Sequence, residues 1–229
     1  MSTADVPTPT ASALRLVVAA ERLFAIHGID GVSLRQIAAA AGSGNNSAVH
    51  YHFRSKQGLI RAIFRHRLPQ IIGERRLLTA RCDPDDLRSR LEAHFLPLLT
   101  MAEAPDNHYV SFIDQIQRLD PSTAIDMLDL PEDGLRSNEE LRSDLHRLLG
   151  HVDEAVRDLR INEGQAFCLH AAADRDRTVS SGTVTVSFGI WSNSFLDGIA
   201  GYLAAPVSVE TERHIQGAGD IGASRLRLL

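Results

Sequence analysis

The 229-residue chain has two cysteines, a single lysine and no long apolar run. Cys82 and Cys168 are too few and too far apart for a disulfide framework or a zinc knuckle, so we expect two thiols in a reducing compartment. No apolar stretch approaches the roughly 20 residues needed to cross a bilayer. The chain begins with MSTADVPTPTASA, which has neither the basic start nor the apolar core of a secretion signal. We therefore predict a cytoplasmic protein with no membrane partner.

Signatures of catalysis and of metal binding are also missing. The sequence has no Gly-rich phosphate loop, no nucleophile elbow around a serine and no paired-carboxylate signature. His50 and His52 form the best candidate for a metal-binding pair, but residues two apart on a helix point in roughly opposite directions. His146 and His151, five apart, diverge as well. We expect no catalytic residue, no metal and no cofactor, and a helical enzyme is the least favoured function.

The charge is distributed unevenly along the chain. The formal net charge is −5, but residues 1–68 carry eight basic and three acidic side chains, which gives +5. The remaining residues carry 16 basic and 26 acidic side chains, which gives −10. Such segregation suggests that the N-terminal part meets a polyanion while the rest stays away from it, although a solvated basic helix face would look the same.

Apolar spacing and capping residues predict four helices in the N-terminal part. The first runs from residue 11 to a stop at Gly28. Ser33 and Gln36 form a capping-box pattern in front of a short helix at residues 34–41. After a turn, a helix of about two turns follows at residues 48–53. A longer helix begins after Ser55 and is expected to end or kink at Pro69.

The rest of the chain is also helical by its periodicity. Two helices are expected around residues 87–98 and 110–119, and two long ones at residues 139–173 and 178–205. Residues 183–188 alternate like a strand, but we assign them to the last helix because its apolar stripe runs through them. Residues 120–138 are expected to be an irregular connection. No internal repeat is present.

These elements predict an all-α fold with two domains. Residues 1–10 form a flexible leader, and residues 11–70 form a three-helix helix-turn-helix DNA-binding domain. Residues 71–206 form a helical ligand-binding and dimerisation domain, and residues 207–229 form a polar, Gly-rich tail that is partly disordered.

Three strings in the N-terminal part occur in a specific order and spacing: SLRQIAAAAG at residues 33–42, NNSAVHYHF at residues 45–53 and SK at residues 55–56. Together they resemble the N-terminal domain of the tetracycline-repressor (TetR) family, which shows a capped "S…IA..AG" helix, a recognition helix ending in "LYxHF" and "SK" opening the next helix. The turn before the recognition helix is one residue longer than is usual in the family, and His50 stands where a tyrosine is usual. The resemblance implies a homodimer that binds a double-stranded DNA operator and responds to a small-molecule effector.

The exposed positions of this unit are the candidate DNA contacts. A helix of two turns fits a major groove, and asparagine can bind an adenine edge in bidentate fashion. The candidates for base or phosphate contact are Ser33, Arg35, Asn45, Asn46, Ser47, His50, Tyr51 and Lys56.

Several of these residues also have a simpler structural role. Asn45 or Asn46 can act only as a helix cap, and Ser33 can act only in its capping box. Lys56 follows the cap Ser55, and a lysine beside a helix N-terminus forms an anion site suited to a DNA phosphate.

The second domain offers weaker signals. The candidates for an effector pocket are Phe95, Met101, Tyr109, Phe112, Ile116, Met127 and Phe167, although ordinary core residues have the same composition. The candidates for a dimer interface are Leu148, Val152, Trp191, Phe195 and Tyr202, for which burial within one subunit is the alternative.

The sequence therefore favours a ligand-responsive transcriptional regulator, most simply a repressor, that binds a palindromic operator as a dimer. Its effector is expected to be small and apolar or aromatic. The alternative is a protein that binds DNA constitutively and whose C-terminal region serves assembly alone.

Overall fold

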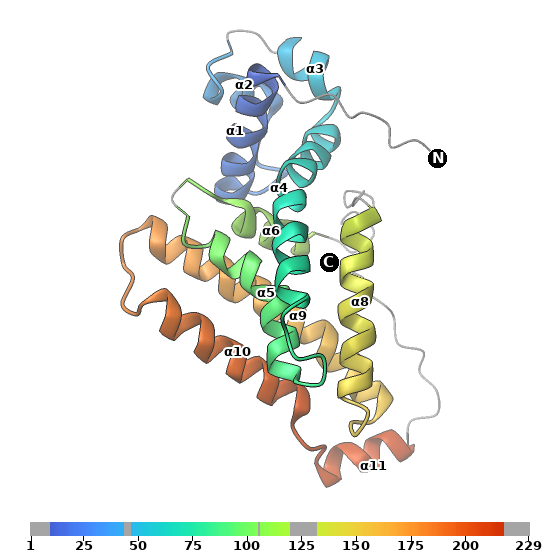
Figure 1. Ribbon diagram of the computed structural model, residues 1–229. Helices are drawn as coiled ribbons and strands as arrows, with labels where there is room; N and C mark the ends of the chain where they lie inside the picture. Colours follow the sequence, from blue (N-terminus) through green and yellow to red (C-terminus); the bar gives the residue numbers. More distant parts are fainter. Residues whose placement is uncertain (1–9, 44–46, 105, 120–131, 218–229) are drawn as a thin grey trace.

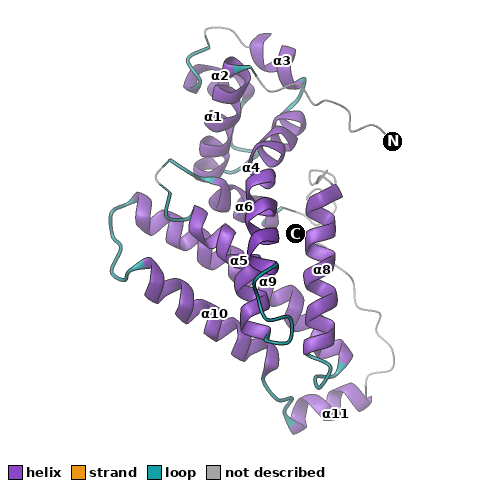
Figure 2. Cartoon of the chain, in the orientation of Figure 1, coloured by secondary structure: helices purple, strands orange, loops and turns teal. Residues whose placement is uncertain are grey.

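The computed structural model describes residues 10–43, 47–104, 106–119 and 132–217. In these residues the chain forms ten α-helices and no strand, which confirms the all-α prediction (Figures 1 and 2). No helix in these ranges is long and apolar enough to span a membrane. The helices are α1 (Ala11–His27), α2 (Leu34–Ala40), α3 (Ser47–Phe53), α4 (Lys56–Thr79), α5 (Leu87–Met101), α6 (Tyr109–Gln117), α8 (Glu132–Leu148), α9 (Glu154–Ser180), α10 (Phe188–Ala204) and α11 (Val209–Gly217).

Local capping defines the N-terminal helices. The Thr10 hydroxyl accepts a hydrogen bond from Ala13 N at 3.2 Å, and α1 ends at Gly28, whose φ of 74° lies in the left-handed region that glycine tolerates. The capping box before α2 is present: Ser33 Oγ accepts from Gln36 N, and Gln36 Oε1 accepts from Ser33 N at 2.8 Å. These bonds satisfy backbone groups that the first helical turn leaves unpaired.

Short helices of this kind need support from their neighbours. Phe24, Ile37 and Val49 are fully buried, and α1, α2, α3 and α4 contact one another through this small core. The same core continues along α4 and into the C-terminal helices, so the described chain shares one apolar interior.

Helix α4 runs through Pro69 for another ten residues, to Thr79. Of the two predicted outcomes, an end or a kink at Pro69, the end does not occur, and the expected domain boundary at residue 70 lies inside α4. Leu68, Ile71 and Ile72 on either side of the proline are buried, and α4 packs on both α5 and α8. Tertiary packing offsets the one backbone hydrogen bond that the proline cannot donate.

The long C-terminal helices differ from the prediction in their boundaries. The helix expected at 139–173 is two helices, because the chain breaks after Leu148 and Asp153 caps α9 by accepting from Ala155 N at 2.9 Å. The helix expected at 178–205 is also interrupted: α9 continues to Ser180, and α10 begins only at Phe188. Gly182, with a φ of 69°, terminates α9, and the intervening residues are exposed.

Two segments expected to be irregular contain helices. Residues 132–138 of the predicted connection belong to α8, and residues 209–217 of the predicted tail form α11. Helix α11 contributes no buried residue, whereas α8 buries Leu141 and Leu145 against the shared interior.

A buried ion pair joins the N-terminal helices to the C-terminal ones. Glu21 of α1 is 1% exposed and accepts two hydrogen bonds from the Arg67 guanidinium of α4, both at 2.7 Å. The same carboxylate accepts from the backbone N of His108, at the start of α6, at 3.2 Å. Three helices therefore meet at one charged side chain.

Candidate functional site

The predicted DNA contacts lie at one end of the molecule, where α2, α3 and the start of α4 meet (Figure 1). Tyr51 on α3 is 83% exposed, His50 beside it is exposed, and Val49 points inward with no exposed surface. This division is the one predicted for a recognition helix. His50 Nδ1 lies 3.2 Å from the carbonyl oxygen of Arg54, so one ring nitrogen is occupied at the C-terminus of α3.

Ser33 and Arg35 are exposed at the N-terminus of α2. The Ser33 hydroxyl is engaged in the capping box on both sides, because it also donates to Gln36 Oε1 at 2.7 Å. The predicted capping role of Ser33 is therefore present, and its contact with a phosphate remains a prediction. Arg35 carries no intramolecular ion pair in the described chain, so its guanidinium is available to solvent.

Lys56 has an unexpected partner. Its Nζ donates to the carbonyl oxygen of Ile29 at 2.8 Å and so ties the start of α4 to the loop after α1. An ammonium group has three donors, so this bond leaves donors for a phosphate. Ser47 is the first residue of α3, and its side chain is not described; Asn45, Asn46 and Met127 lie outside the described residues.

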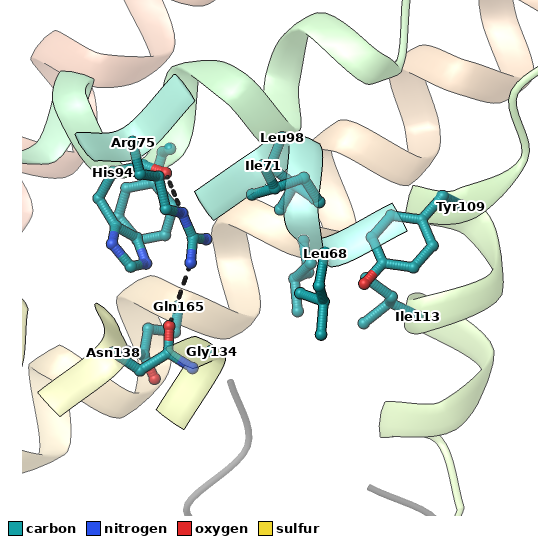
Figure 3. A pocket seen from close by; sticks show the side chains of 12 residues that line it. Leu68, Ile71, Arg75, His94, Leu98, Tyr109, Ile113, Gly134, Asn138 and Gln165 are labelled. Atoms are coloured by element: carbon teal, nitrogen blue, oxygen red, sulfur yellow. Dashed lines mark hydrogen bonds between the residues drawn. The ribbon is translucent and has the colours of Figure 1, made fainter. Parts of the chain in front are cut away.

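A cavity lies among α4, α5, α6, α8 and α9, and Figure 3 shows its lining. Its enclosed volume is about 30 Å³, within about 510 Å³ of space between the helices that includes open solvent. Its apolar wall consists of Leu68, Ile71, Phe95, Leu98, Ile113 and Leu169. Its polar side chains are Arg75, His94, Tyr109, Asn138 and Gln165. Mostly apolar walls with a few convergent polar groups are typical of a small-molecule site.

Arg75 is the most unusual of these side chains. It is 9% exposed; its Nε donates to the His94 carbonyl oxygen at 2.9 Å and its Nη1 donates to Asn138 Oδ1 at 3.2 Å. Burial lowers the pKa of Arg75 to about 10, so the guanidinium is still charged near neutral pH. Arg75 also lines a second, more polar hollow between α4 and α8, together with Arg76 and Arg136.

Two further polar groups of the cavity are neutral. Burial, reinforced by the positive charges of Arg75 and Arg90, lowers the pKa of His94 well below its usual value. Burial raises the pKa of Tyr109, and its hydroxyl is buried without a hydrogen-bond partner in the described chain. In Figure 3, Tyr109 lies at one end of the cavity and Arg75 with His94 at the other.

The structure brings two of the predicted pocket residues, Phe95 and Tyr109, to the cavity wall. Met101, Phe112 and Ile116 are buried in the core but do not line this cavity. Phe167 is 49% exposed on α9, so its assignment to the pocket is not supported by its position.

Four of the five polar side chains of the cavity were not predicted from the sequence: Arg75, His94, Asn138 and Gln165. One signal was available for Arg75, because it continues the buried stripe of α4 that includes Leu68, Ile71 and Ile72. A charged residue at such a position is expected to be paired or functional. His94 and Asn138 carried no comparable signal, since their approach to Arg75 depends on how α5 and α8 pack.

The predicted dimerisation residues are largely covered within the subunit. Val152 is buried, and Leu148, Trp191, Phe195 and Tyr202 are half-buried. The Arg175 guanidinium lies 5.4 Å from the centre of the Trp191 ring, and the Tyr202 hydroxyl donates to Glu163. The large apolar side chains exposed on α9 and α10 are instead Leu159, Phe167 and Ile190.

No group of histidine, cysteine and acidic side chains suited to a metal ion occurs in the ranges that the structure describes.

Comparison with known proteins identifies the N-terminal part. Residues 16–63 match the family model described as "Bacterial regulatory proteins, tetR family". The match spans α1 to α4 up to Ile63, and so includes the helices that hold the candidate DNA contacts. No curated protein matches the sequence significantly.

Solved structures share the fold of most of the chain. A regulatory protein of the tetR family from Rhodococcus RHA1 is 17% identical, with a TM-score of 0.53, and the alignment covers 86% of this chain and all of that one. AibR, in complex with isovaleryl coenzyme A and operator DNA, is 16% identical with a TM-score of 0.52, covering 86% and 100%. The TetR-family regulator PfmR from Thermus thermophilus is 19% identical with a TM-score of 0.50, covering 81% and 97%.

A match over these residues is typical of the DNA-binding part of a bacterial regulator. The N-terminal helices, residues 16–63, therefore match the DNA-binding domain of the tetR family of bacterial regulatory proteins, and the chain as a whole shares the fold of solved members of that family.

Proposed function

We propose that this regulator is a repressor that binds a palindromic operator as a homodimer and releases it when a small effector enters the cavity beside α4. The observation that carries the proposal is the continuity of α4. The helix begins at Lys56 beside the recognition helix and continues into the cavity wall, where Leu68, Ile71 and Arg75 meet the empty space. An effector in the cavity would therefore contact the same rigid element that positions the DNA-binding surface.

A ligand shifts such an equilibrium only by its difference in affinity between two conformers. A coupling of about 1–3 kcal/mol changes operator affinity by roughly 5–150-fold. The Glu21–Arg67 ion pair, with its additional hydrogen bond from the His108 backbone, adds a second connection between α1, α4 and α6. Movement of α4 relative to α6 would strain the hydrogen bonds of this buried cluster and would therefore also displace α1.

The charge and exposure of the N-terminal end support the operator contact. Tyr51 and His50 are exposed on α3, Arg35 is exposed at the start of α2, and Lys56 lies at the start of α4. A single two-turn helix reads few base pairs, whereas two of them about 34 Å apart read both halves of a palindrome. Dimerisation therefore fits the size of this surface.

The exposed apolar side chains of α9 and α10 are the best-supported dimer surface. Leu159, Phe167 and Ile190 are 55%, 49% and 62% exposed, and α9 and α10 pack side by side. Helix α10 also has an open face at Gly198 and Gly201, where an added Cβ would meet no atom within 4 Å. The α10 faces of two subunits could therefore approach each other closely.

The lining of the cavity supports an effector with an apolar or aromatic body, because six of its twelve lining residues are apolar and large. A protein with this fold, AibR, has been crystallised with both an acyl coenzyme A and operator DNA. The fold can thus bind a small ligand and operator DNA in the same protein.

The test begins with DNA selected from a random pool by the full-length protein, followed by rebinding in the presence of a library of small metabolites. We expect a palindromic consensus and release by a subset of compounds. Release should disappear when the cavity is filled by Gly134→Phe, a substitution at a cavity-lining glycine of α8. DNA binding that is identical with every compound would favour the alternative of a constitutive DNA-binding protein.

The dimer is tested separately by light scattering during size-exclusion chromatography. Phe167→Glu should convert a dimer to a monomer, because it places a charge on the proposed interface. Leu77→Glu is the matched control, since Leu77 is 64% exposed on α4 and lies outside that surface. A wild-type monomer at micromolar concentration, or equal effects of both substitutions, would contradict the assignment.

A further inference from the structure

Arg75 differs from the other buried arginines of the described chain. Arg90 of α5 pairs with Asp144, and Arg175 of α9 pairs with Glu103. Arg75 is about as buried, but no carboxylate of the described residues lies within ion-pair distance, and its charge is met by a carbonyl and an amide oxygen. A buried charge without a counter-ion is costly, so proteins seldom retain one without a use.

The neighbouring groups do not supply the missing negative charge. Burial raises the pKa of both Tyr109 and Cys168, so both are neutral near pH 7. His94 is neutral as well, and the positive field of Arg75 and Arg90 contributes to its lowered pKa. The Arg75 end of the cavity is therefore positively charged and has no internal anion to compensate it.

The guanidinium retains bonding capacity that faces this space. Its Nε and Nη1 are engaged by His94 O and Asn138 Oδ1, while Nη2 takes part in no hydrogen bond within the described chain. At the opposite end, the buried Tyr109 hydroxyl has no partner among the described residues. Polar groups with unused bonding capacity at the two ends of one cavity are the mark of a site built for a ligand.

We propose that the effector is a monocarboxylic acid with an apolar body, whose carboxylate is bound by Arg75 and whose body lies along Leu68 and Ile71 toward Tyr109. The proposal rests on the proposed function, because it treats this cavity as the effector site. A single charge is favoured over a phosphate dianion, since Arg90 pairs with Asp144, and the arginines of the adjoining hollow, Arg76 and Arg136, face Asp133 and Glu132. Arginine is also the side chain best shaped to hold a carboxylate.

The length of the body follows from α4. Leu68 and Arg75 are seven residues apart, which is about 10 Å of helix rise, roughly the length of an eight-carbon chain. The Tyr109 ring lies beyond Leu68, with its centre 6.1 Å from that of Phe64, one turn earlier on α4. A chain of this length would place its carboxylate at Arg75 and its other end near Tyr109.

Calorimetry on the full-length protein tests the proposal with two acids and their neutral counterparts: octanoate against octanamide, and 4-phenylbutanoate against 4-phenylbutanamide. We expect at least one acid to bind at least tenfold more tightly than its amide. Arg75→Gln should abolish that preference while leaving amide binding unchanged. Arg81→Gln, an exposed arginine past the end of α4, should leave both unchanged.

The wild-type comparison does not depend on the folding of any variant. Equal binding of acids and amides, or binding of neither acid, would overturn the proposal. Operator release is measured in parallel and separates the two levels of inference. An acid that binds through Arg75 without releasing DNA would support the ligand class and contradict the effector role. Release of the operator by other compounds, with no binding of the acids, would support the effector role of the cavity and contradict the ligand class.

Discussion

Replacing Arg75 by methionine should make the ligand-free protein more stable, although most substitutions of buried residues destabilise. The physical reason is that the guanidinium is charged, buried and without a carboxylate partner in the described chain. Methionine has a similar shape and no charge, so it keeps much of the packing between α4, α5 and α8. If Arg75 is retained to bind a ligand, its removal should relieve a cost that the empty protein bears.

The magnitude follows from the pKa of Arg75. A decrease from 12.5 to about 10 means that burial penalises the charged form. At about 1.4 kcal/mol per pKa unit, the penalty is about 3 kcal/mol. Methionine loses the hydrogen bonds to the His94 carbonyl and to Asn138, worth roughly 1 kcal/mol each in net terms. Asn138 is half-buried and can turn to water. We therefore expect a net stabilisation of about 1–2 kcal/mol.

The assay is urea unfolding at fixed protein concentration, since the stability of a dimer depends on concentration. The midpoint should rise with an unchanged slope, and the thermal midpoint should rise by roughly 2–4 °C per kcal/mol for a chain of this size. Arg90→Met is the matched control. Arg90 is 5% exposed and paired with Asp144, so the same substitution there should destabilise by about 2–4 kcal/mol.

A decrease of about 1 kcal/mol or more for Arg75→Met would refute the reasoning. It would show that Arg75 acts as a structural link between α4, α5 and α8, and that its two hydrogen bonds outweigh the desolvation of its charge. Equal effects of Arg75→Met and Arg90→Met would have the same meaning, because the counter-ion would then make no difference.

Three further substitutions test other parts of the structure. Glu21→Gln should lower the free energy of unfolding by about 3 kcal/mol, measured by urea unfolding, because it leaves Arg67 without its buried partner. A decrease of less than about 1 kcal/mol would contradict a structural role of this ion pair. Tyr51→Ala should weaken operator binding by about 10–100-fold in gel-shift titrations and change stability by less than about 0.5 kcal/mol, since Tyr51 is 83% exposed; unchanged DNA affinity would remove it from the contact surface. The pKa of His94 is lowered in the folded state, so the unfolded state binds the additional proton and the free energy of unfolding falls as pH decreases below 6.5. His94→Gln should reduce this pH dependence by up to about 1.4 kcal/mol per pH unit between about pH 6.5 and 5. Parallel curves of unfolding free energy against pH for the wild type and the variant would disprove the assignment.

Much of the N-terminal unit could be predicted from sequence because its signals are local. The capping box of Ser33 and Gln36 and the cap at Ser55 each involve residues three apart, so neither depends on the rest of the fold. The outward position of Tyr51 and the inward position of Val49 follow from helical period alone. These local features carry the resemblance to the tetR family, and none of them depends on a tertiary contact.

The misplaced boundaries in the C-terminal part have a different origin. An apolar stripe on each side of Gly150 and of Gly182 looked continuous, and the caps at Asp153 and Ser187 were overlooked. At Pro69 the helix was predicted to end or kink, and it does not end there, because α4 packs on its neighbours on both sides of the proline. Periodicity shows which residues face a core but not whether the chain turns between them.

The cavity was decided by tertiary structure alone. Arg75, His94 and Asn138 come from α4, α5 and α8, separated by 19 to 63 positions, and no local rule relates them. The sequence by itself determined the N-terminal helices, the caps at Ser33 and Ser55 and the exposed face of the recognition helix, because each depends on neighbours within one or two turns. Only the packing of distant helices could bring an arginine into an apolar space without a carboxylate beside it, and that placement is what suggests the chemistry of the effector.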